Sequence, residues 1–286
     1  MDKRIGAQLY TLREFCQTAE DFDDTLKKVS EIGYKIIQVS GIGPISAADI
    51  KKSADKYGLK ICCTHKGPDD FKPENLENTI AFHKEIGCDI AGIGSMPPEY
   101  RESDDGFKKF IKDYSAAAEI LYKEGIRFGY HNHAIEFKKY EGKHIFYRLA
   151  EETDPDKFTF IFDTYWAAFA GMNVTEVMEK LKGRISVAHY KDLQVVSFLE
   201  TGMCEVGEGN LDWEKIIKAS EETGIEYAVV EQDVCQRDPF ESLKRSFDYL
   251  TKKYQLKMQD RYIIYTKDLK YKDEIMYIPI YMTMLI

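Results

Sequence analysis

The sequence predicts an α/β protein built as a single-domain (β/α)₈ TIM barrel with an atypical C-terminal extension. Three observations lead to this fold class. The chain has 286 residues, and a barrel of this type needs about 250. A junction between a helix and a strand recurs along the chain. Polar side chains that are able to bind a metal follow four of the predicted strands.

The recurring junction is a charged helical stretch, a glycine and then a short apolar run. Glycine just past a helix end adopts the left-handed conformation at little cost, so it stops the helix. The apolar runs do not alternate cleanly with polar residues, which is typical of strands covered on both faces. The junction reads SEIGYKIIQV, DKYGLKICC, KEIGCDIAGI, YKEGIRFGY, LKGRISVAHY and EETGIEYAVV.

The opening run IGAQLYT and the run FTFIFD bring the predicted strands to eight. Helical patterns lie between them, for example over 104–123, 174–181 and 212–222. A doubly wound open sheet is the main alternative, but no GxGxxG or Walker motif follows the first strand. The predicted strands lie near residues 4–10, 35–39, 59–64, 89–93, 127–132, 158–162, 185–190 and 227–231.

Composition limits the classes of partner. The net charge of −9 argues against nucleic-acid binding, which needs a basic surface. The six cysteines form no CxxC motif, so we expect reduced and mostly buried thiols. The N-terminus has no apolar signal region, and no apolar run approaches the roughly 18 residues of a membrane span. We therefore expect a soluble cytoplasmic protein that does not bind membranes.

The end of the chain does not continue the repeat. We expect the barrel domain to cover residues 1–254, followed by an extension over 255–286 of unknown role. The last eleven residues, MYIPIYMTMLI, carry no charge. An apolar arm buried against the barrel or a partner subunit and a non-native extension are the two alternatives.

Four residues define a candidate site, since each lies at or just beyond the end of a predicted strand. They are Glu136 in YHNHAIEF, Asp163 in FIFDTYW, His189 in VAHYKD and Glu231 in VVEQD. Their spacings correspond to about one βα unit, with a loop added in the last. In a parallel barrel the strand ends meet at one rim. Three carboxylates and one imidazole there would form a site for a hard or borderline divalent cation.

Six motifs in order give the chain a resemblance to a known superfamily. GAQLYTLRE, YHNHAIEF, DTYWAAFAG, HYKD, GEGNLDW and VVEQD lie on successive βα units. Over residues 1–254 the chain resembles the xylose-isomerase-like TIM barrels, the superfamily of sugar isomerases and epimerases and of AP endonuclease family 2. The superfamily also contains inosose dehydratase, keto-sugar epimerases and endonuclease IV.

The resemblance implies a divalent metal held by Glu136, Asp163, His189 and Glu231. Asp163 and His189 match the family pattern best. Glu136 lies three residues past His133, so His131 or His133 is an alternative as ligand or substrate contact. The expected ion is Mn²⁺, with Mg²⁺ or Co²⁺ as alternatives.

The implied chemistry is proton abstraction next to a carbonyl. The cation polarises that carbonyl and stabilises an enediolate, and a carboxylate removes the proton. Epimerisation needs a second acid or base on the opposite face of the carbon. Glu136 and Glu231 are the expected pair.

Further side chains are candidates for contact with the substrate. Each has a structural alternative: a hydrogen-bonded histidine, a surface lysine, a packing aromatic residue or a solvated loop carboxylate. Asn132 and Asp192 are candidates for orienting the ligands, and Arg13 lies on the same expected rim as Tyr10. The substrate-contact candidates are His65, His131, His133, Trp166, Lys191, Glu208 and Tyr10.

Four functions remain open at this point. A metal-dependent isomerase or epimerase acting on a sugar or keto-sugar is favoured. Gln38 stands where similar epimerases often place a glutamate, which leaves the reaction class open. A dehydratase or lyase acting on a keto-sugar or inosose is the first alternative, and a non-catalytic sugar-binding barrel is the second. The six histidines and the negative charge disfavour a DNA-repair endonuclease. A carbohydrate substrate and a homodimer or homotetramer are expected.

Overall fold

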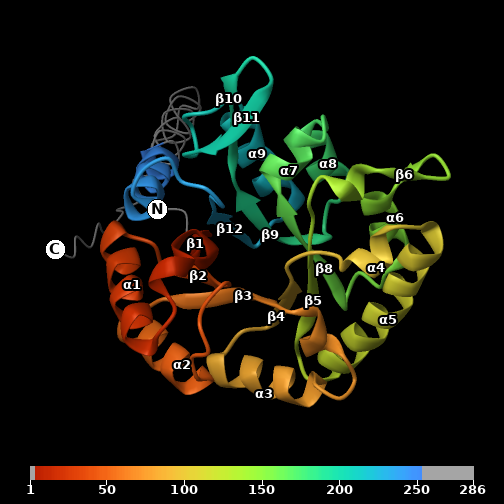
Figure 1. The fold of residues 1–286 in the computed structure, drawn as a ribbon, viewed down its shortest axis with the longest axis horizontal. Coiled ribbons are helices and arrows are strands. Elements are labelled where there is room, and N and C mark those ends of the chain that lie inside the picture. Colours follow the sequence, from red (N-terminus) through yellow and green to blue (C-terminus); the bar gives the residue numbers. More distant parts are fainter. Residues whose placement is uncertain (1–3, 253–286) are drawn as a thin grey trace, which may run out of the picture.

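Eight parallel strands close into a barrel in the computed structural model, which describes residues 4–252 (Figure 1). Around the barrel the order is β1-β12-β9-β8-β5-β4-β3-β2. The predicted TIM barrel is therefore confirmed. The strands are β1 (Ile5–Gln8), β2 (Ile36–Val39), β3 (Lys60–Lys66), β4 (Ile90–Ile93), β5 (Arg127–His131), β8 (Phe158–Asp163), β9 (Ile185–Tyr190) and β12 (Tyr227–Val230).

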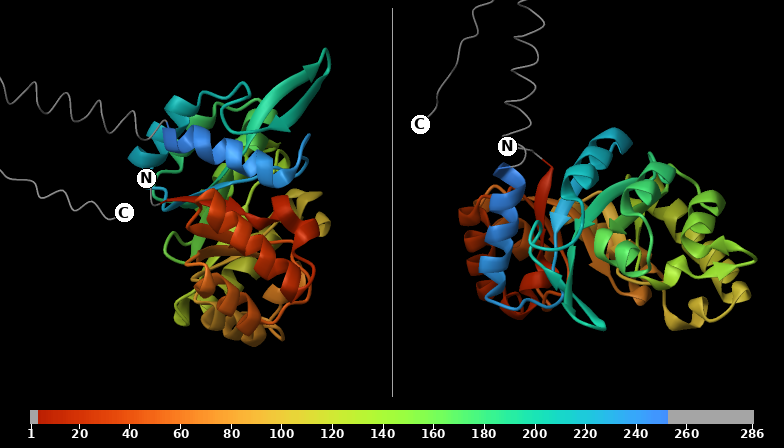
Figure 2. Two further views of the ribbon diagram at one scale, coloured as in Figure 1. Left: turned by 90° about the vertical axis from the view of Figure 1, so that its left-hand side faces the viewer. Right: turned by 90° about the horizontal axis from the view of Figure 1, so that it is seen from above.

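Helices surround the barrel on its outer side (Figures 1 and 2). A further helix covers residues 239–252 and packs Phe247 against Tyr34. Short 3₁₀ helices include η1 (Leu9–Phe15), η2 (Pro68–Phe71) and η3 (Ile135–Phe137). The other helices are α1 (Ala19–Ile32), α2 (Ala47–Lys56), α3 (Leu76–Ile86), α4 (Pro98–Arg101), α5 (Asp104–Lys123), α6 (Ile145–Glu152), α7 (Thr164–Phe169), α8 (Val174–Lys180) and α9 (Trp213–Thr223).

The hydrogen bonds at the helix ends explain how the glycine of the recurring junction ends each helix. At the end of α1 the backbone N–H of Gly33 donates to the carbonyl oxygen of Ser30. At the end of α3 the N–H of Gly87 donates to the carbonyl oxygens of His83 and Lys84. Both glycines have positive φ angles, 121° and 69°, where a side chain would be strained. The next strand begins within a few residues of each glycine, so the junction sets the repeat of the barrel.

A small apolar cluster fills the interior of the barrel, separate from the larger core between strands and helices. Glycines make room for it: a Cβ on Gly92 would lie 2.4 Å from the Thr64 carbonyl oxygen and 2.6 Å from Cδ1 of Ile161. A side chain at Gly92 would therefore collide with its neighbours in the barrel interior. The buried members are Ile36, Cys62, Cys63, Ile90, Ile161, Val187 and Val229.

The interior cluster also shows in which direction the side chains at the strand ends point. Side chains two apart on a strand point to the same face. Asp163, His189 and Glu231 each follow an interior residue of the cluster by two positions, namely Ile161, Val187 and Val229. They therefore point into the mouth of the barrel at the carboxyl ends of the strands.

Two antiparallel hairpins interrupt the repeat of strands and helices. The sequence predicted only an added loop at the position of the larger one, β10–β11. β10 (Asp192–Ser197) pairs with β11 (Glu200–Cys204), and β6 (Lys139–Tyr140) pairs with β7 (Lys143–His144). The β10–β11 hairpin projects away from the barrel (Figure 2). Phe198 and Leu199 at its turn are 98% and 87% exposed.

Several further expectations concern the described residues directly. The six cysteines are free thiols, five of them buried, as expected. Within residues 4–252 no helix is long and apolar enough to cross a membrane. The extension over 255–286 lies outside the described residues. The domain boundary, the homo-oligomer and the cytoplasmic location stay predictions.

Candidate metal centre

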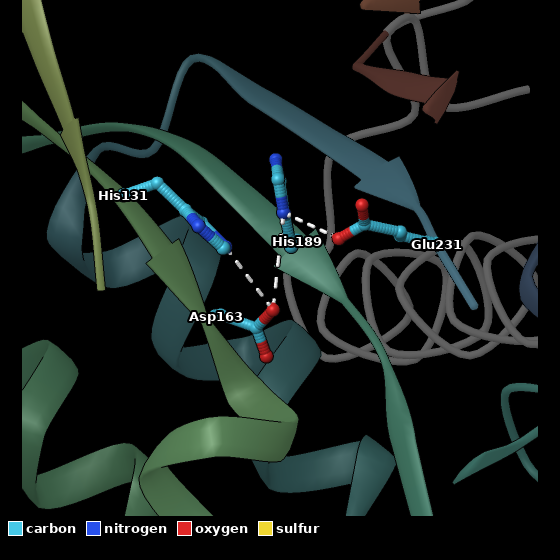
Figure 3. Close-up of side chains that lie close together, drawn as sticks. All are labelled: His131, Asp163, His189 and Glu231. Carbon is cyan, nitrogen blue, oxygen red and sulfur yellow. Dashed lines mark hydrogen bonds and ion pairs between the residues drawn. The ribbon is translucent and has the colours of Figure 1, made fainter. Parts of the chain in front are cut away.

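Four buried side chains converge at the carboxyl ends of four neighbouring strands (Figure 3). His131 ends β5, Asp163 ends β8, His189 lies near the end of β9, and Glu231 follows β12. One ligand atom from each lies within 4.8 Å of all the others. Asp163 and His189 are direct neighbours in the strand register. All four side chains are at most 5% exposed.

His131 is oriented by the backbone. Its Nδ1 lies 2.8 Å from the carbonyl oxygen of Gly94. Because a carbonyl only accepts hydrogen bonds, Nδ1 carries the proton. Nε2 faces the centre and lies 3.3 Å from Oδ2 of Asp163.

His189 is oriented by a side chain on the opposite part of the barrel. Its Nε2 donates to Oε1 of Gln38 at 2.9 Å. Its Nδ1 lies 2.7 Å from Oε2 of Glu231 and 3.9 Å from Oδ2 of Asp163. His189 Nδ1 makes no well-aligned hydrogen bond among the described residues, and Oε2 of Glu231 is paired with the ammonium of Lys191 at 2.9 Å.

This arrangement tests whether the residues fit a cation. With the outer nitrogens of both imidazoles donating away, the inner nitrogens of the neutral rings would present lone pairs beside two carboxylate oxygens. Buried acceptor atoms that face one another at such distances are costly unless positive charge lies among them. Lys191 supplies one positive charge to the two carboxylates, and a metal ion would supply positive charge to the imidazole nitrogens as well. Two imidazole nitrogens and two carboxylate oxygens are also ligand types that divalent transition metals accept. The four residues fit a divalent metal ion.

Lys191 also brings positive charge to the centre, two residues beyond His189. Its ammonium is 1% exposed and lies 3.0 Å from Oδ2 of Asp163, 2.9 Å from Oε2 of Glu231 and 3.1 Å from Oδ1 of Asp233. Burial would lower the pKa of this lysine, but the three carboxylates raise it above its ordinary value. The alternative of a surface lysine is therefore wrong.

The same charges keep both carboxylates ionised. Burial alone would raise the pKa of Asp163, but Lys191 and His131 lower it to about 2. Lys191 and His189 outweigh burial at Glu231 in the same way and hold its pKa well below the ordinary value. Burial lowers the pKa of His189, which favours the neutral imidazole that a metal needs.

Glu136, expected as a ligand and as a catalytic base, is not a member of this group. One carboxylate oxygen accepts a hydrogen bond from the Tyr130 hydroxyl at 2.6 Å, and the other accepts one from the His133 backbone N–H at 2.7 Å. The physical reason is local, because η3 turns the chain back after β5. His131 provides the fourth ligand atom of the group, which was one of the alternatives that the sequence left open.

Three other candidates for substrate contact lie beside the group. The ring of His65 is 5.0 Å from that of His131 and 5.5 Å from that of His189. The ring of His133 lies between His131 and Trp166, at 4.8 Å and 5.2 Å. Nε2 of His65 and Nε1 of Trp166 are buried and have no hydrogen-bond partner among residues 4–252. They are polar atoms that a ligand could satisfy.

His65, which lies beside the centre, also lines a cavity of about 290 Å³. The cavity lies beside β2 and β3, and its lining includes Ser40, Gly41, Lys66 and Gly67. This cavity offers an approach to the histidine side of the centre.

The remaining candidates have other surroundings. Glu208 forms ion pairs with Arg237 and Arg245, which fix its loop. Tyr10 is 37% exposed and stacks on Arg13. Their roles in substrate binding stay predictions.

Asn132 and Asp192, expected to orient the ligands, contact the backbone around the centre. The backbone N–H of Asp163 donates to Oδ1 of Asn132 at 2.9 Å. Asp192 anchors the loop after β11, with Gly207, Gly209 and Leu211 donating their N–H groups to it.

Two residues of the centre were not recognised as such from the sequence. Gln38 was noted only as a departure from a family pattern, yet it is the hydrogen-bond partner of His189. Asp233, which contacts Lys191, was not singled out. For Gln38 the strand period was an available signal, because Gln38 follows the interior residue Ile36 by two positions.

Comparison with known proteins gives relatives that match most of the chain. The chain is 26% identical over 265 residues to an inosose dehydratase of Lacticaseibacillus casei, covering 80% of this chain and 88% of that protein. An inosose dehydratase of Geobacillus thermodenitrificans is also 26% identical, with the same 80% and 88% coverage.

Solved structures of similar fold include a sugar phosphate isomerase/epimerase from Parabacteroides distasonis. It has a TM-score of 0.73 and 28% identity, covering 87% of this chain and 94% of that one. The family model described as xylose isomerase-like TIM barrel matches residues 26–253. The chain therefore belongs to the xylose isomerase-like TIM barrel family.

Proposed function

We propose that this protein is a divalent-metal-dependent enzyme that removes a proton next to the carbonyl of a polyhydroxy ketone, and that it then eliminates water. The observation that carries the proposal is the set of four buried acceptor atoms from His131, Asp163, His189 and Glu231. Their burial and short separations support a metal site at the mouth of the barrel.

The ligand set bears on the choice of metal. Two imidazoles and two carboxylates suit Mn²⁺, Co²⁺ and similar ions better than Mg²⁺, which prefers oxygen ligands. We therefore propose Mn²⁺, with Co²⁺ as the alternative. When bound, the ion would polarise the substrate carbonyl and lower the energy of the enolate.

The side chains supply the proton transfers. Glu231, which is ionised and points into the barrel mouth, is the proposed base that takes the proton from the carbon next to the carbonyl. The electron pair of that C–H bond forms the enolate double bond. The enolate electrons then re-form the carbonyl, and a C=C double bond forms between the α- and β-carbons as the bond to the β-hydroxyl breaks. The departing oxygen keeps the electron pair of that bond, takes a proton and leaves as water. Lys191, which is cationic and 2.9 Å from Glu231, is the proposed donor of that proton.

The position of Glu136 favours dehydration over epimerisation. Epimerisation needs an acid/base group on each face of the carbon, and Glu136 was the expected second group. Its two oxygens are occupied by Tyr130 and His133. Elimination needs only one base and a proton donor near the leaving group. The similarity to inosose dehydratases supports a keto-cyclitol such as an inosose as the substrate.

Epimerisation or isomerisation of a keto-sugar is the second candidate. It is supported by the 28% identity to the isomerase/epimerase of P. distasonis. The two candidates share the first proton transfer. They differ in the product, because an isomer keeps the mass of the substrate and dehydration removes one water.

The test combines metal content with product mass. Purified wild-type protein, Asp163→Asn and the control Glu85→Gln are analysed for bound metal and then supplied with Mn²⁺ and an inosose. Glu85 is an exposed carboxylate of α3, so its substitution controls for loss of a charge. We expect about one ion per chain in wild type and control, little in Asp163→Asn, and a product lighter by one water.

Two results would change the proposal. A product of unchanged mass would replace dehydration by epimerisation. If the wild-type protein takes up no Mn²⁺, Co²⁺ or Mg²⁺, the metal-dependent reaction is refuted. A non-catalytic sugar-binding barrel would then be the better hypothesis.

A further inference from the structure

We propose that Gln38 is a positioning residue of the metal centre, which holds His189 in the tautomer whose Nδ1 binds the ion. This inference rests on the proposed metal-dependent function. It concerns a residue that lies outside the four ligands and on a strand that carries none of them.

Gln38 reaches His189 across the barrel. It is the third residue of β2, is fully buried, and follows the interior residue Ile36 by two positions. In the closed barrel β2 and β9 are separated by β1 and β12. The hydrogen bond between Gln38 Oε1 and His189 Nε2 therefore spans the interior rather than following the sheet.

The hydrogen bond decides which nitrogen carries the proton. An amide oxygen has no proton to donate, so His189 Nε2 must carry one. In a neutral imidazole this leaves Nδ1 with a lone pair, and Nδ1 is the atom that lies 2.7 Å from Glu231. Metal-binding histidines commonly donate their other ring N–H to such an outer acceptor, which fixes both tautomer and ring orientation.

The other histidine of the centre has an equivalent acceptor in the backbone. His131 Nδ1 donates to the Gly94 carbonyl, which no side-chain substitution removes. Gln38 is thus the acceptor that mutation can test. Its oxygen is uncharged, so it orients His189 without adding a third buried negative charge to Asp163 and Glu231. Its amide nitrogen has no partner in the described part of the chain, so the contact of Oε1 is what ties the side chain to the centre.

The test compares Mn²⁺ affinity between Gln38→Met and Gln38→Glu. Methionine keeps the length and burial but removes the acceptor, whereas glutamate keeps an acceptor oxygen. Affinity is measured by competition with a chromogenic chelator. We expect Gln38→Met to bind Mn²⁺ about 10–100-fold more weakly than wild type, and Gln38→Glu to bind within about threefold of wild type or more tightly.

Gln8→Met is the matched control. Gln8 is also fully buried and occupies the corresponding end of β1, but its Oε1 accepts from the backbone N–H of Tyr10 rather than from a ligand. Its substitution is expected to leave Mn²⁺ affinity unchanged. Circular dichroism checks that each variant folds. If Gln38→Met does not fold, Gln38→Asn replaces it, because its shorter amide no longer reaches His189 and should weaken Mn²⁺ binding in the same way.

The possible failures are distinguishable. If wild-type protein binds no Mn²⁺, the proposed function fails and the role of Gln38 fails with it. If wild type binds Mn²⁺ and Gln38→Met binds equally well, only the positioning role is overturned. A Gln38→Glu variant as weak as Gln38→Met would also overturn it, because packing rather than the acceptor would then explain both losses.

Discussion

The ammonium of Lys191 lies 3.0 Å from Oδ2 of Asp163, an atom that also faces the two histidines of the centre. Lys191 and the proposed metal ion would therefore offer positive charge to the same carboxylates. In the absence of a metal, Lys191 is the buried cation that offsets Asp163, Glu231 and Asp233. The proposed metal ion would be repelled by this ammonium across a few ångströms.

Replacing Lys191 by methionine should have opposite effects on the two forms. The metal-free protein should lose about 3–5 kcal/mol of stability, because buried carboxylates lose their partner. The metal ion should bind more tightly, because it no longer meets a neighbouring charge. The measurement is the melting temperature with and without Mn²⁺, and the rise on adding Mn²⁺ should be larger in Lys191→Met than in wild type.

The matched control for this experiment is Lys215→Met at an exposed position, where the lysine pairs with Asp212 at the start of α9. It should leave the response to Mn²⁺ unchanged. An equal response in Lys191→Met and wild type would show that Lys191 does not compete with the ion.

Substitutions of His131 and of Glu136 are expected to have different effects on metal binding. His131→Gln should lower Mn²⁺ affinity by more than the 10–100-fold typical of losing an outer-shell partner, since a ligand itself is lost. Glu136→Gln should keep the metal, because its carboxylate is engaged by Tyr130 and His133. Isothermal titration with Mn²⁺ measures both. Loss of metal in Glu136→Gln with retention in His131→Gln would restore the ligand set expected from the sequence.

The contrast between these two residues shows where sequence reasoning succeeds and where it stops. Asp163, His189 and Glu231 were found because they lie at strand ends, where the period of two fixes their direction. Glu136 lies five residues beyond the end of β5, in a segment whose path depends on the turn η3 and on tertiary contacts with Tyr130. No local pattern encodes that path, so the choice between His131 and Glu136 needed the structure.

The fold could be predicted from the sequence more completely than the site. The helix–glycine–strand junction is a local signal, and it recovered six of the eight barrel strands. The apolar runs IGAQLYT and FTFIFD gave the other two, and the helical pattern over 104–123 gave the limits of α5, Asp104–Lys123. The β10–β11 hairpin was missed because its strands expose Val195 and Val196 and lack the buried, alternating pattern that identifies a strand.

Asp192 is predicted to be the main anchor of the segment between this hairpin and α9. Its carboxylate accepts from the N–H groups of Gly207, Gly209 and Leu211 and from the indole of Trp213. In Asp192→Asn an NH₂ group would face N–H donors, so unfolding should require about 3 kcal/mol less free energy. Urea unfolding followed by Trp213 fluorescence measures the change.

Asp212→Asn is the control for Asp192→Asn. Asp212 caps the N-terminus of α9 by accepting a hydrogen bond from the Lys215 N–H, and it also pairs with the exposed Lys215 ammonium. Asparagine caps helices about as well as aspartate, so the cost should be only a few tenths of a kcal/mol. Equal losses in the two variants would mean that the several N–H groups around Asp192 do not depend on its charge.

His83 should make the stability of the fold depend on pH below neutrality. The imidazole is buried between α3 and β3, where Nδ1 donates to the Thr79 carbonyl and Nε2 accepts from the Thr64 hydroxyl. Burial is the main cause that lowers its pKa from 6.5 to about 4. As the pH falls through this window the unfolded chain gains a proton that the folded chain does not. Stability is therefore lost on acidification, by about 3 kcal/mol in full.

Replacing His83 by glutamine isolates this contribution. Glutamine keeps a donor and an acceptor but does not titrate, so the difference in unfolding free energy between wild type and His83→Gln should shift in favour of the variant from pH 7 to pH 4. Glu85→Gln, at an exposed position of the same helix, controls for an unrelated change on α3. A constant difference between wild type and His83→Gln over that range would show that His83 accepts a proton in the folded protein as readily as in the unfolded chain, and that its two hydrogen bonds do not hold it neutral.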